Sequence, residues 1–318
     1  GVIAALEFVE TLEDEGITTE RPVEIVNWTN EEGSRFQPAM MSSGVWAGHL
    51  PLEEAYETTD RDGVRFVDEL ERIGYRGDVP AEPGYDYDSY LELHIEQGPR
   101  LEESGDEVGV VTGIVGFQWG EITFEGQANH SGTTPMHHRR DALVGAADVI
   151  TQVRRIPGTL GERTVGTTGV IEAAPGSINI VPGEVTFTVG FRDPDDGTVE
   201  TAVERVKGEA AAAAEREGLE WEYEERMAVE SVDFAERCVD AVQAAADDRG
   251  YASQRLVSGA GHDATHVASV CDAAMVFSVS EGGKSHSPKE YTNWDDCYAA
   301  ADTLANAALD LAGVAEER

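Results

Sequence analysis

The chain has 318 residues, 41% of them hydrophobic, which is enough apolar material for a buried core and, by length, for two domains. Aspartate and glutamate number 62 against 23 lysines and arginines, giving a formal net charge of −39. A nucleic-acid-binding protein needs basic patches and a membrane span needs about 20 consecutive apolar residues, and the sequence contains neither. We therefore expect no nucleic-acid partner and no membrane partner.

The acidic residues are spread along the whole chain and alternate with periodic apolar residues, whereas a disordered acidic tail would be blocky. Charge repulsion of this size is tolerable where salt screens it over about 3 Å, at 1 M. We therefore expect a cytoplasmic protein of a high-salt organism, with an ordinary acidic protein as the alternative. The three cysteines lack CxxC spacing, which favours a reduced compartment over disulfides or a thiolate metal site.

The two ends of the chain predict strands that alternate with helices. Residues 2–12 place five apolar side chains on one helical face. Residues 23–28 predict a short buried strand of a parallel sheet, and residues 90–99 predict another strand with His94 near its end. Further predictions are a helix at 232–249, a strand at 273–279 and a helix at 294–311. This order indicates an α/β sheet, in which ligands bind at the carboxyl ends of strands.

The middle of the chain follows a different order. The patterns predict strands at 119–125, 164–172, 184–192 and 219–227, and helices at 141–155 and 198–217. The order is β-α-β-β-α-β, the split pattern of ferredoxin-like domains. We therefore expect an α/β domain made of residues 1–112 and 228–318, with residues 113–227 inserted as a separate domain.

Two adjacent carboxylates, Glu31 and Glu32, follow the first predicted strand. Paired glutamates in a loop are more often solvated, but neighbouring like charges favour a positive partner where they are held together. His94 and His286 are also predicted at strand ends of the same sheet. Imidazole together with carboxylate suits zinc, manganese, nickel or cobalt. One glutamate can bind the metal while its neighbour takes a proton from water, as in metal hydrolases.

Two more histidines, His130 and His262, lie in segments rich in glycine and small polar residues. A lone histidine after a strand is more often a hydrogen-bonded structural residue than a ligand. We expect the remaining four histidines to be surface or packing residues.

Six segments together resemble one family. They are "TNEEGSRF", "HIEQGP", "ANHSGTTPM" followed by "RRDA", "GSINIVPGEVTFTVGFRD", "SGAGHDA" and "SHSPKEY". The set closely resembles the N-carbamoyl-L-amino acid hydrolases. These belong, with β-ureidopropionase and allantoate amidohydrolase, to the hydantoinase/carbamoylase branch of the zinc aminoacylase and carboxypeptidase superfamily. The resemblance implies a two-metal α/β domain that carries an inserted ferredoxin-like lid. It also implies that the protein forms a homodimer through this inserted domain.

The resemblance also implies roles for residues of the α/β domain. Glu31 would be the general base, and Glu32, His94 and His286 would be metal ligands. Gln97 and the turn at Gly261 would complete the substrate pocket. The reaction implied is cleavage of the carbamoyl C–N bond, with Glu31 passing a proton to the leaving nitrogen and releasing ammonia, carbon dioxide and an amino acid.

In the inserted domain, the resemblance implies that His130 reaches the active site of the partner subunit and stabilises the developing oxyanion. Asn179 and Arg192 would hold the substrate carboxylate, for which the planar fork of arginine is well suited.

The chain departs from the family in one respect. The family's bridging aspartate and a further metal-binding histidine lie upstream, in an H-x-D segment and a following F-D-G segment. This chain has no H-x-D before Glu31 and no histidine before His49. We therefore expect an N-terminally truncated chain that lacks these two ligands. The alternative is a non-catalytic remnant that acts as a ligand-binding or dimerisation module.

Substrate choice depends on the residues after "GIVG". This chain has Phe117, Gln118 and Trp119 there, whereas allantoate hydrolases tend toward Gln-Arg-Arg. The tryptophan resembles carbamoylases and ureidopropionases, so we expect an N-carbamoyl amino acid, although an aromatic residue there is equally consistent with core packing. An aminoacylase or peptidase specificity is disfavoured because those enzymes carry a carboxylate where this chain has His94.

Overall fold

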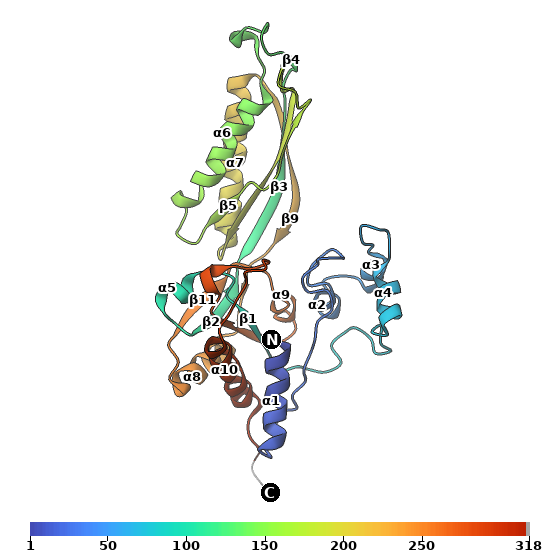
Figure 1. The fold of residues 1–318 in the computed structure, drawn as a ribbon, viewed down its shortest axis with the longest axis vertical. Helices are drawn as coiled ribbons and strands as arrows, with labels where there is room; N and C mark the ends of the chain where they lie inside the picture. The colour runs from blue at the N-terminus through green and yellow to red at the C-terminus, as the bar shows by residue number, and fades with distance from the viewer. Residues whose placement is uncertain (316–318) are drawn as a thin grey trace. The chain divides into compact units, whose positions relative to one another are not determined.

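The computed structural model describes residues 1–315, which form two units. Unit 1 combines residues 1–114 with the chain from Asp233 onward, and unit 2 consists of residues 115–232. Each unit has a sheet of its own (Figure 1). The unit boundaries lie within five residues of the ends of the predicted insertion, 113–227.

The sheet of unit 1 carries the candidate site. Its strands are β1 (Ser89–Ile95), β12 (Asp272–Ser278), β2 (Val108–Ile114), β11 (Ser253–Ser258) and, at the junction, β10 (Val232–Asp233). β1 is parallel to β12, β12 is antiparallel to β2, and β11 is parallel to β2. β2 and β12 are almost entirely buried, which explains why both read as continuous apolar runs.

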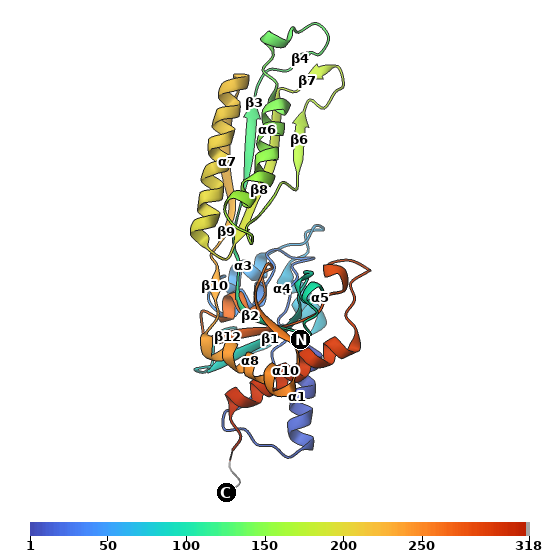
Figure 2. The same cartoon turned by 90° about the vertical axis from the view of Figure 1, so that its left-hand side faces the viewer.

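Helices cover this sheet. α8 (Glu236–Arg249) and α10 (Trp294–Ala312) pack on each other and on β12, and α1 (Val2–Asp14) packs on α10 (Figure 2). Short elements complete the unit: α5 (Arg100–Ser104), α9 (Ala264–Val267) and η3 (Glu281–Gly283). The predicted helix at 232–249 was too long, since its first residues form β10 and the helix begins at Glu236.

A small cluster lies beside the loop that bears the paired glutamates. The helices α2 (Met41–Trp46), α3 (Leu52–Glu57) and α4 (Phe66–Ile73) surround it. Its buried members are Phe36, Met41, Ala55, Phe66 and Leu70. The rings of Phe36 and Phe66 meet edge to face, with centroids 5.2 Å apart.

The predicted strand at 23–28 is wrong. Within residues 1–315 this run has no backbone pairing with another strand, and Val23 and Val26 are 38% and 37% exposed. Two side-chain hydrogen bonds tie it to the neighbourhood of β1. Tyr87 Oη donates to Glu24 Oε2 at 2.9 Å, and Trp28 Nε1 donates to Tyr90 Oη at 3.1 Å. A strand is stable only with a hydrogen-bonded neighbour, so apolar composition alone does not form one here.

The sheet of unit 2 has the order β5 (Val165–Thr167), β8 (Glu184–Asp193), β3 (Gly116–Glu125) and β9 (Glu220–Val229), and β6 (Ile171–Ala174) also pairs with β8. Two helices, α6 (Ala142–Arg155) and α7 (Asp196–Glu217), lie side by side along one face (Figure 1). The predicted strand at 164–172 is broken, because Gly169 N and Val170 N donate to the side-chain Oγ1 of Thr188 on β8 rather than to a backbone carbonyl of that strand. The remaining elements follow the predicted β-α-β-β-α-β order.

The core of unit 2 lies between this sheet and its two helices. Ile122, Phe124, Phe187 and Phe191 are fully buried there, packed on small helix residues. One end of the unit carries β4 (Asn129–His130) paired with β7 (Ile180–Val181), and the short helix η1 (Met136–His138); η2 (Pro157–Thr159) follows α6. Among residues 1–315, no helix is long and apolar enough to cross a membrane.

Candidate active site

The loop that carries Glu31 and Glu32 is held by its own backbone and side chains. Asn30 adopts φ +59°, and its side-chain nitrogen Nδ2 donates to Phe36 O at 2.9 Å and to Pro38 O at 3.1 Å. At Gly33, φ is +62°, and a Cβ would lie 2.8 Å from the Ala39 backbone. Only glycine fits this position without strain. The "TNEEG" sequence therefore specifies a tight turn that presents both glutamates.

Glu31 lies in an environment that resists its negative charge. Burial, followed by the neighbouring charges of Asp263 and Glu32, raises the pKa of Glu31 to about 7, and His286 partly opposes this rise. A carboxyl group with a pKa near neutrality can both accept and return a proton at physiological pH. These properties suit a general base.

Glu32 faces a histidine. His286 Nε2 lies 3.3 Å from Glu32 Oε2. The His286 backbone adopts φ +53°, and its N–H donates to Glu290 Oε2 at 3.0 Å. The fold thus brings two residues that are 254 positions apart in the sequence to within 3.3 Å of each other.

His94, on β1, has a defined tautomer. Its Nδ1–H donates to Ile95 O at 2.8 Å, which leaves Nε2 with its lone pair, the form that binds a metal. Burial lowers the pKa of His94 and so favours the neutral ring. Its ring centroid lies 4.7 Å from that of His262.

These residues fit only part of a metal centre. Glu32 and His286 form a pair, and His94 has the required tautomer. Yet within the part of the chain that the structure describes, no three His, Cys, Asp or Glu side chains converge closely enough to hold a metal ion. The described residues do not assemble the two-metal centre that the resemblance implies.

Gln97 and Gly261 both lie beside these residues. Gln97, at φ +56°, donates from its backbone to Ser280 Oγ at 3.0 Å and from its side chain to Ser285 Oγ at 2.7 Å, one residue before His286. At Gly261, a Cβ would lie 3.1 Å from Met40 Cε. Because Met40 N donates to Glu31 O at 2.7 Å, glycine here lets the turn at 261 approach the glutamate loop.

Sequence reasoning missed two buried carboxyl groups, Glu92 and Asp263. Glu92 Oε2 accepts from Ala264 N at 2.9 Å and Tyr90 Oη at 3.1 Å, and burial raises the pKa of Glu92 to about 8. Burial also raises the pKa of Asp263 to about 6, opposed by a hydrogen bond from Ser43 Oγ at 2.5 Å. One signal was available for Glu92: it lies two residues before His94, hence on the same face of β1.

The contacts of His262 are those of a buried packing residue. It is almost fully buried, its Nε2 lies 2.9 Å from Ser258 Oγ, and its Nδ1 has no hydrogen-bond partner. Burial, with a smaller contribution from His94, lowers the pKa of His262 to about 3. The ring is therefore neutral at physiological pH.

In unit 2, the structure places His130 next to Asn179. Ser131 N donates to Asn179 O at 2.8 Å. His130 Nδ1 accepts from Gly132 N at 3.0 Å and Thr133 N at 3.2 Å, so the ring proton of neutral His130 resides on Nε2. That nitrogen is a donor, as an oxyanion-binding group must be.

Arg192 lies at the other end of unit 2. It is near the end of β8, directly opposite Phe117 of β3, whereas His130 and Asn179 lie beyond the start of β8, where β4 and β7 pair (Figure 2). Arg192 lies eight residue steps along the extended strand from Glu184, roughly 27 Å at about 3.4 Å per step. Burial lowers the pKa of Arg192. The structure does not bring the three predicted substrate residues of unit 2 together.

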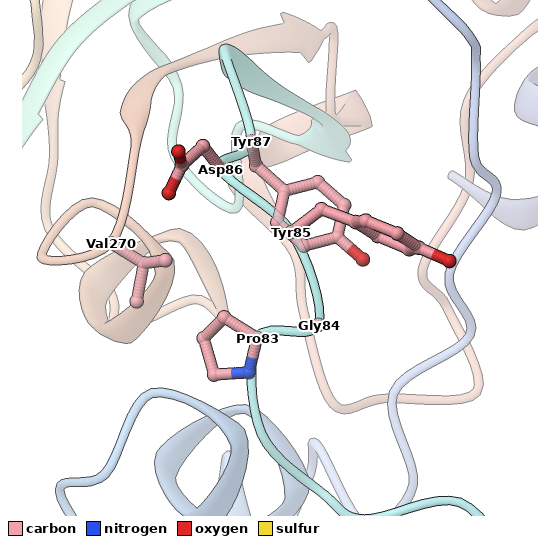
Figure 3. A pocket seen from close by; sticks show the side chains of 6 residues that line it. All are labelled: Pro83, Gly84, Tyr85, Asp86, Tyr87 and Val270. Carbon is pink, nitrogen blue, oxygen red and sulfur yellow. The ribbon is translucent and has the colours of Figure 1, made fainter.

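A surface cavity of about 420 Å³ lies elsewhere in unit 1. Figure 3 shows its lining, which is the segment from Pro83 to Tyr87 together with Val270. The Tyr87 ring meets Trp46, which meets Trp28, both edge to face. None of the candidate site residues lines this cavity.

Glu31 thus lies beside a glutamate–histidine pair in unit 1, and comparison with known proteins identifies the class of protein. The family model for peptidase family M20/M25/M40 matches residues 1–310, and the chain belongs to this family. Its relatives include amidohydrolases, so the protein is an amide-cleaving hydrolase.

Three relatives illustrate the similarity. An N-carbamoyl-L-amino-acid amidohydrolase of Rhizobium meliloti is 40% identical over 318 residues, covering 99% of this chain and 76% of the relative. An allantoate amidohydrolase of Bacillus subtilis is 33% identical over 294 residues, covering 92% of this chain and 71% of the relative. The crystal structure of a hydantoinase/carbamoylase family amidase from Burkholderia multivorans matches with a TM-score of 0.93 at 44% identity, covering 98% and 76%. The chain thus spans about three quarters of these relatives.

Proposed function

We propose that the protein hydrolyses the carbamoyl C–N bond of N-carbamoyl-L-amino acids, releasing the amino acid, carbon dioxide and ammonia. The observation that carries this proposal is Glu31, whose pKa is raised to about 7 beside the Glu32–His286 pair. The relatives that share 33–40% identity and are named N-carbamoyl-L-amino-acid amidohydrolases support the substrate class.

Glu31 is the residue that moves the proton in this proposal. Its carboxylate accepts a proton from the attacking water, and the resulting carboxylic acid donates that proton to the leaving nitrogen. Both transfers need a group whose pKa lies near the working pH. The fixed turn at Asn30 and Gly33 holds the backbone from which the Glu31 side chain extends.

The family is generally dependent on divalent metal, and we propose Glu32, His94 and His286 as the ligands that this chain supplies. A bound zinc, manganese, cobalt or nickel ion would act as a Lewis acid. Since these three residues do not converge, and a two-metal centre also needs further ligands, the proton transfers above are argued from Glu31 alone.

We further propose that the protein works as a homodimer whose unit 2 supplies substrate contacts. His130 would stabilise the oxyanion through its Nε2–H, and Asn179 and Arg192 would hold the substrate carboxylate. His130 and Arg192 lie at opposite ends of one unit 2, so a single copy cannot place both on one small substrate. In the proposed homodimer, His130 of one copy would reach the active site of the other.

Allantoate is the second candidate substrate, because allantoate amidohydrolases of Bacillus subtilis and Escherichia coli are 33% and 31% identical to the chain. Trp119, which resembles the residue of carbamoylases at this position, favours N-carbamoyl-L-amino acids over allantoate. The test is release of ammonia and amine from N-carbamoyl-L-amino acids, allantoate, N-acetyl amino acids and dipeptides, with manganese or zinc present and in high salt. Turnover of the N-carbamoyl substrates at the highest kcat/KM supports the proposal. Preferred turnover of allantoate or of a dipeptide contradicts it, and no turnover favours a ligand-binding module.

A further inference from the structure

Arg192 lies against two aromatic rings of the same sheet. On β3, Phe117 and Trp119 point to the face of the sheet that α6 and α7 do not cover, here called the helix-free face. The guanidinium carbon of Arg192 lies 5.1 Å from the centroid of Phe117 and 5.8 Å from that of Trp119. Stacking on rings does not use up the N–H donors of an arginine, and its planar fork suits a carboxylate.

A glycine on the neighbouring strand makes this arrangement possible. Gly190 is the cross-strand partner of Trp119. A Cβ at Gly190 would lie 2.8 Å from Trp119 Cδ1 and 3.0 Å from Nε1. The absence of a side chain at Gly190 therefore lets the indole lie across β8 toward Arg192.

The apolar surface around Arg192 is local. Trp119 is 46% exposed and Met227, opposite it on β9, is 44% exposed. Farther along the helix-free face the residues become polar or acidic: Glu121, Thr123, Thr186, Thr188 and Glu222. One end of this face thus combines a cation with exposed aromatic and aliphatic surface. We call Phe117, Trp119 and Arg192 the aromatic platform.

We propose that the aromatic platform selects the side chain of the substrate, and that the substrates are N-carbamoyl derivatives of amino acids with large apolar side chains. This inference rests on the proposed function. In such a substrate the side chain and the carboxylate are attached to the same carbon atom. When Arg192 binds the carboxylate, the side chain must lie close to the guanidinium, where the two rings lie. Burying an apolar side chain on these rings favours phenylalanine or leucine derivatives over glycine.

The test compares kcat/KM for N-carbamoyl-L-phenylalanine with kcat/KM for N-carbamoylglycine. The wild type should prefer the phenylalanine derivative. Trp119→Ala removes one ring, and Gly190→Ala displaces it through the added Cβ. Either change should lower the ratio of the two kcat/KM values by about tenfold, the usual scale of apolar discrimination in a pocket. Glu222→Ala, on the same face but opposite Thr123, is the matched control and should leave the ratio unchanged.

Equal losses for both substrates in Trp119→Ala would overturn the inference, because they would mean that Trp119 only holds Arg192 or the sheet. A wild type that prefers N-carbamoylglycine would also overturn it. Calorimetric binding of the same two compounds to Glu31→Gln separates this inference from the proposed function. If the wild type turns over neither compound, the proposed function fails, while the ratio of binding constants still decides whether the platform selects apolar side chains.

Discussion

Glu31 and Glu32 are adjacent in the sequence but differ in their surroundings. Glu31 is influenced by burial and by Asp263, while Glu32 points to His286 at 3.3 Å. Neighbouring carboxyl groups with different environments can take different roles, one holding a cation and one moving protons. The difference in the surroundings of the two glutamates thus accompanies the turn fixed by Asn30 and Gly33.

Asp263 gives a prediction at the scale of one residue. Its pKa is raised from 3.8 to about 6 by burial, so the folded state binds the proton more tightly than the unfolded state. The contribution of Asp263 to the free energy of unfolding is therefore greatest below about pH 4 and is lost as pH rises to about 6, a loss of about 2–3 kcal/mol. Asp263→Asn should abolish this dependence, measured as the difference between urea unfolding curves of variant and wild type in metal-free buffer.

Ser43 provides the matched variant for this prediction. Its hydroxyl donates to Asp263 Oδ1 at 2.5 Å and so favours the charged carboxylate. Ser43→Ala should therefore make the loss of stability between pH 4 and 6 larger. Parallel pH profiles for wild type and Asp263→Asn would show that the carboxyl group is not buried as described.

At the scale of single residues, the sequence predicts candidate site residues that belong to a recognisable motif. It does not predict residues whose pKa values are shifted by burial in the folded chain. The sequence motifs predict Glu32, His94 and His286 as metal ligands, and of these the structure places Glu32 and His286 in contact. Glu92 and Asp263 were not predicted, since their raised pKa values depend on contacts with residues far away in the chain. Ala264, for example, lies 172 positions from Glu92.

At the scale of elements, the "RRDA" segment has a structural explanation. Arg139 donates to Ser131 O at 2.5 Å and Thr134 O at 3.1 Å, which braces the loop after His130. Asp141 caps α6 by accepting from Leu143 N at 3.1 Å and Val144 N at 3.4 Å. The segment thus braces the loop after His130 and begins a helix.

The cap of α6 can be tested by substitution. Asp141→Ala removes the side-chain acceptor and should lower the free energy of unfolding by about 1 kcal/mol. Asp141→Asn keeps an acceptor oxygen at the N-cap and should cost much less. Denaturant unfolding in high salt measures both. Equal losses in the two variants would mean that the charge of Asp141, and not its capping geometry, stabilises unit 2.

The elements also show where sequence periodicity fails. The helices at 141–155 and 198–217 and the strand at 184–192 were predicted within two residues, because amphipathic periods and caps are local signals. The run at 23–28 has equally apolar residues but no hydrogen-bonded neighbour, and it forms no strand. Pairing is a property of the whole sheet, and a single segment does not encode it.

At the scale of the whole molecule, charge should govern stability. Most of the ion pairs that the structure describes are exposed, as Arg65–Asp68 and Arg216–Asp148 illustrate, and exposed pairs contribute little. They cannot offset the repulsion expected at a net charge of −39. Raising KCl from about 0.2 M to about 2 M should therefore raise the urea midpoint, because salt screens repulsion among surface carboxylates.

Circular dichroism measures this midpoint, and an uncharged osmolyte of equal osmolality is the control. A rise with KCl that exceeds the rise with the osmolyte confirms charge screening. A midpoint that stays constant or falls with KCl would contradict the expectation of a protein adapted to high salt.

The most direct test of the central claim is ammonia release from an N-carbamoyl-L-amino acid by wild type and by Glu31→Gln, with divalent metal in high salt. We expect wild-type turnover and a decrease in kcat of about 10²–10⁴-fold in the variant. Glu53→Gln, an exposed glutamate of α3, should retain wild-type kcat. Equal turnover by wild type and Glu31→Gln would contradict the assignment of Glu31 as the proton-transferring residue.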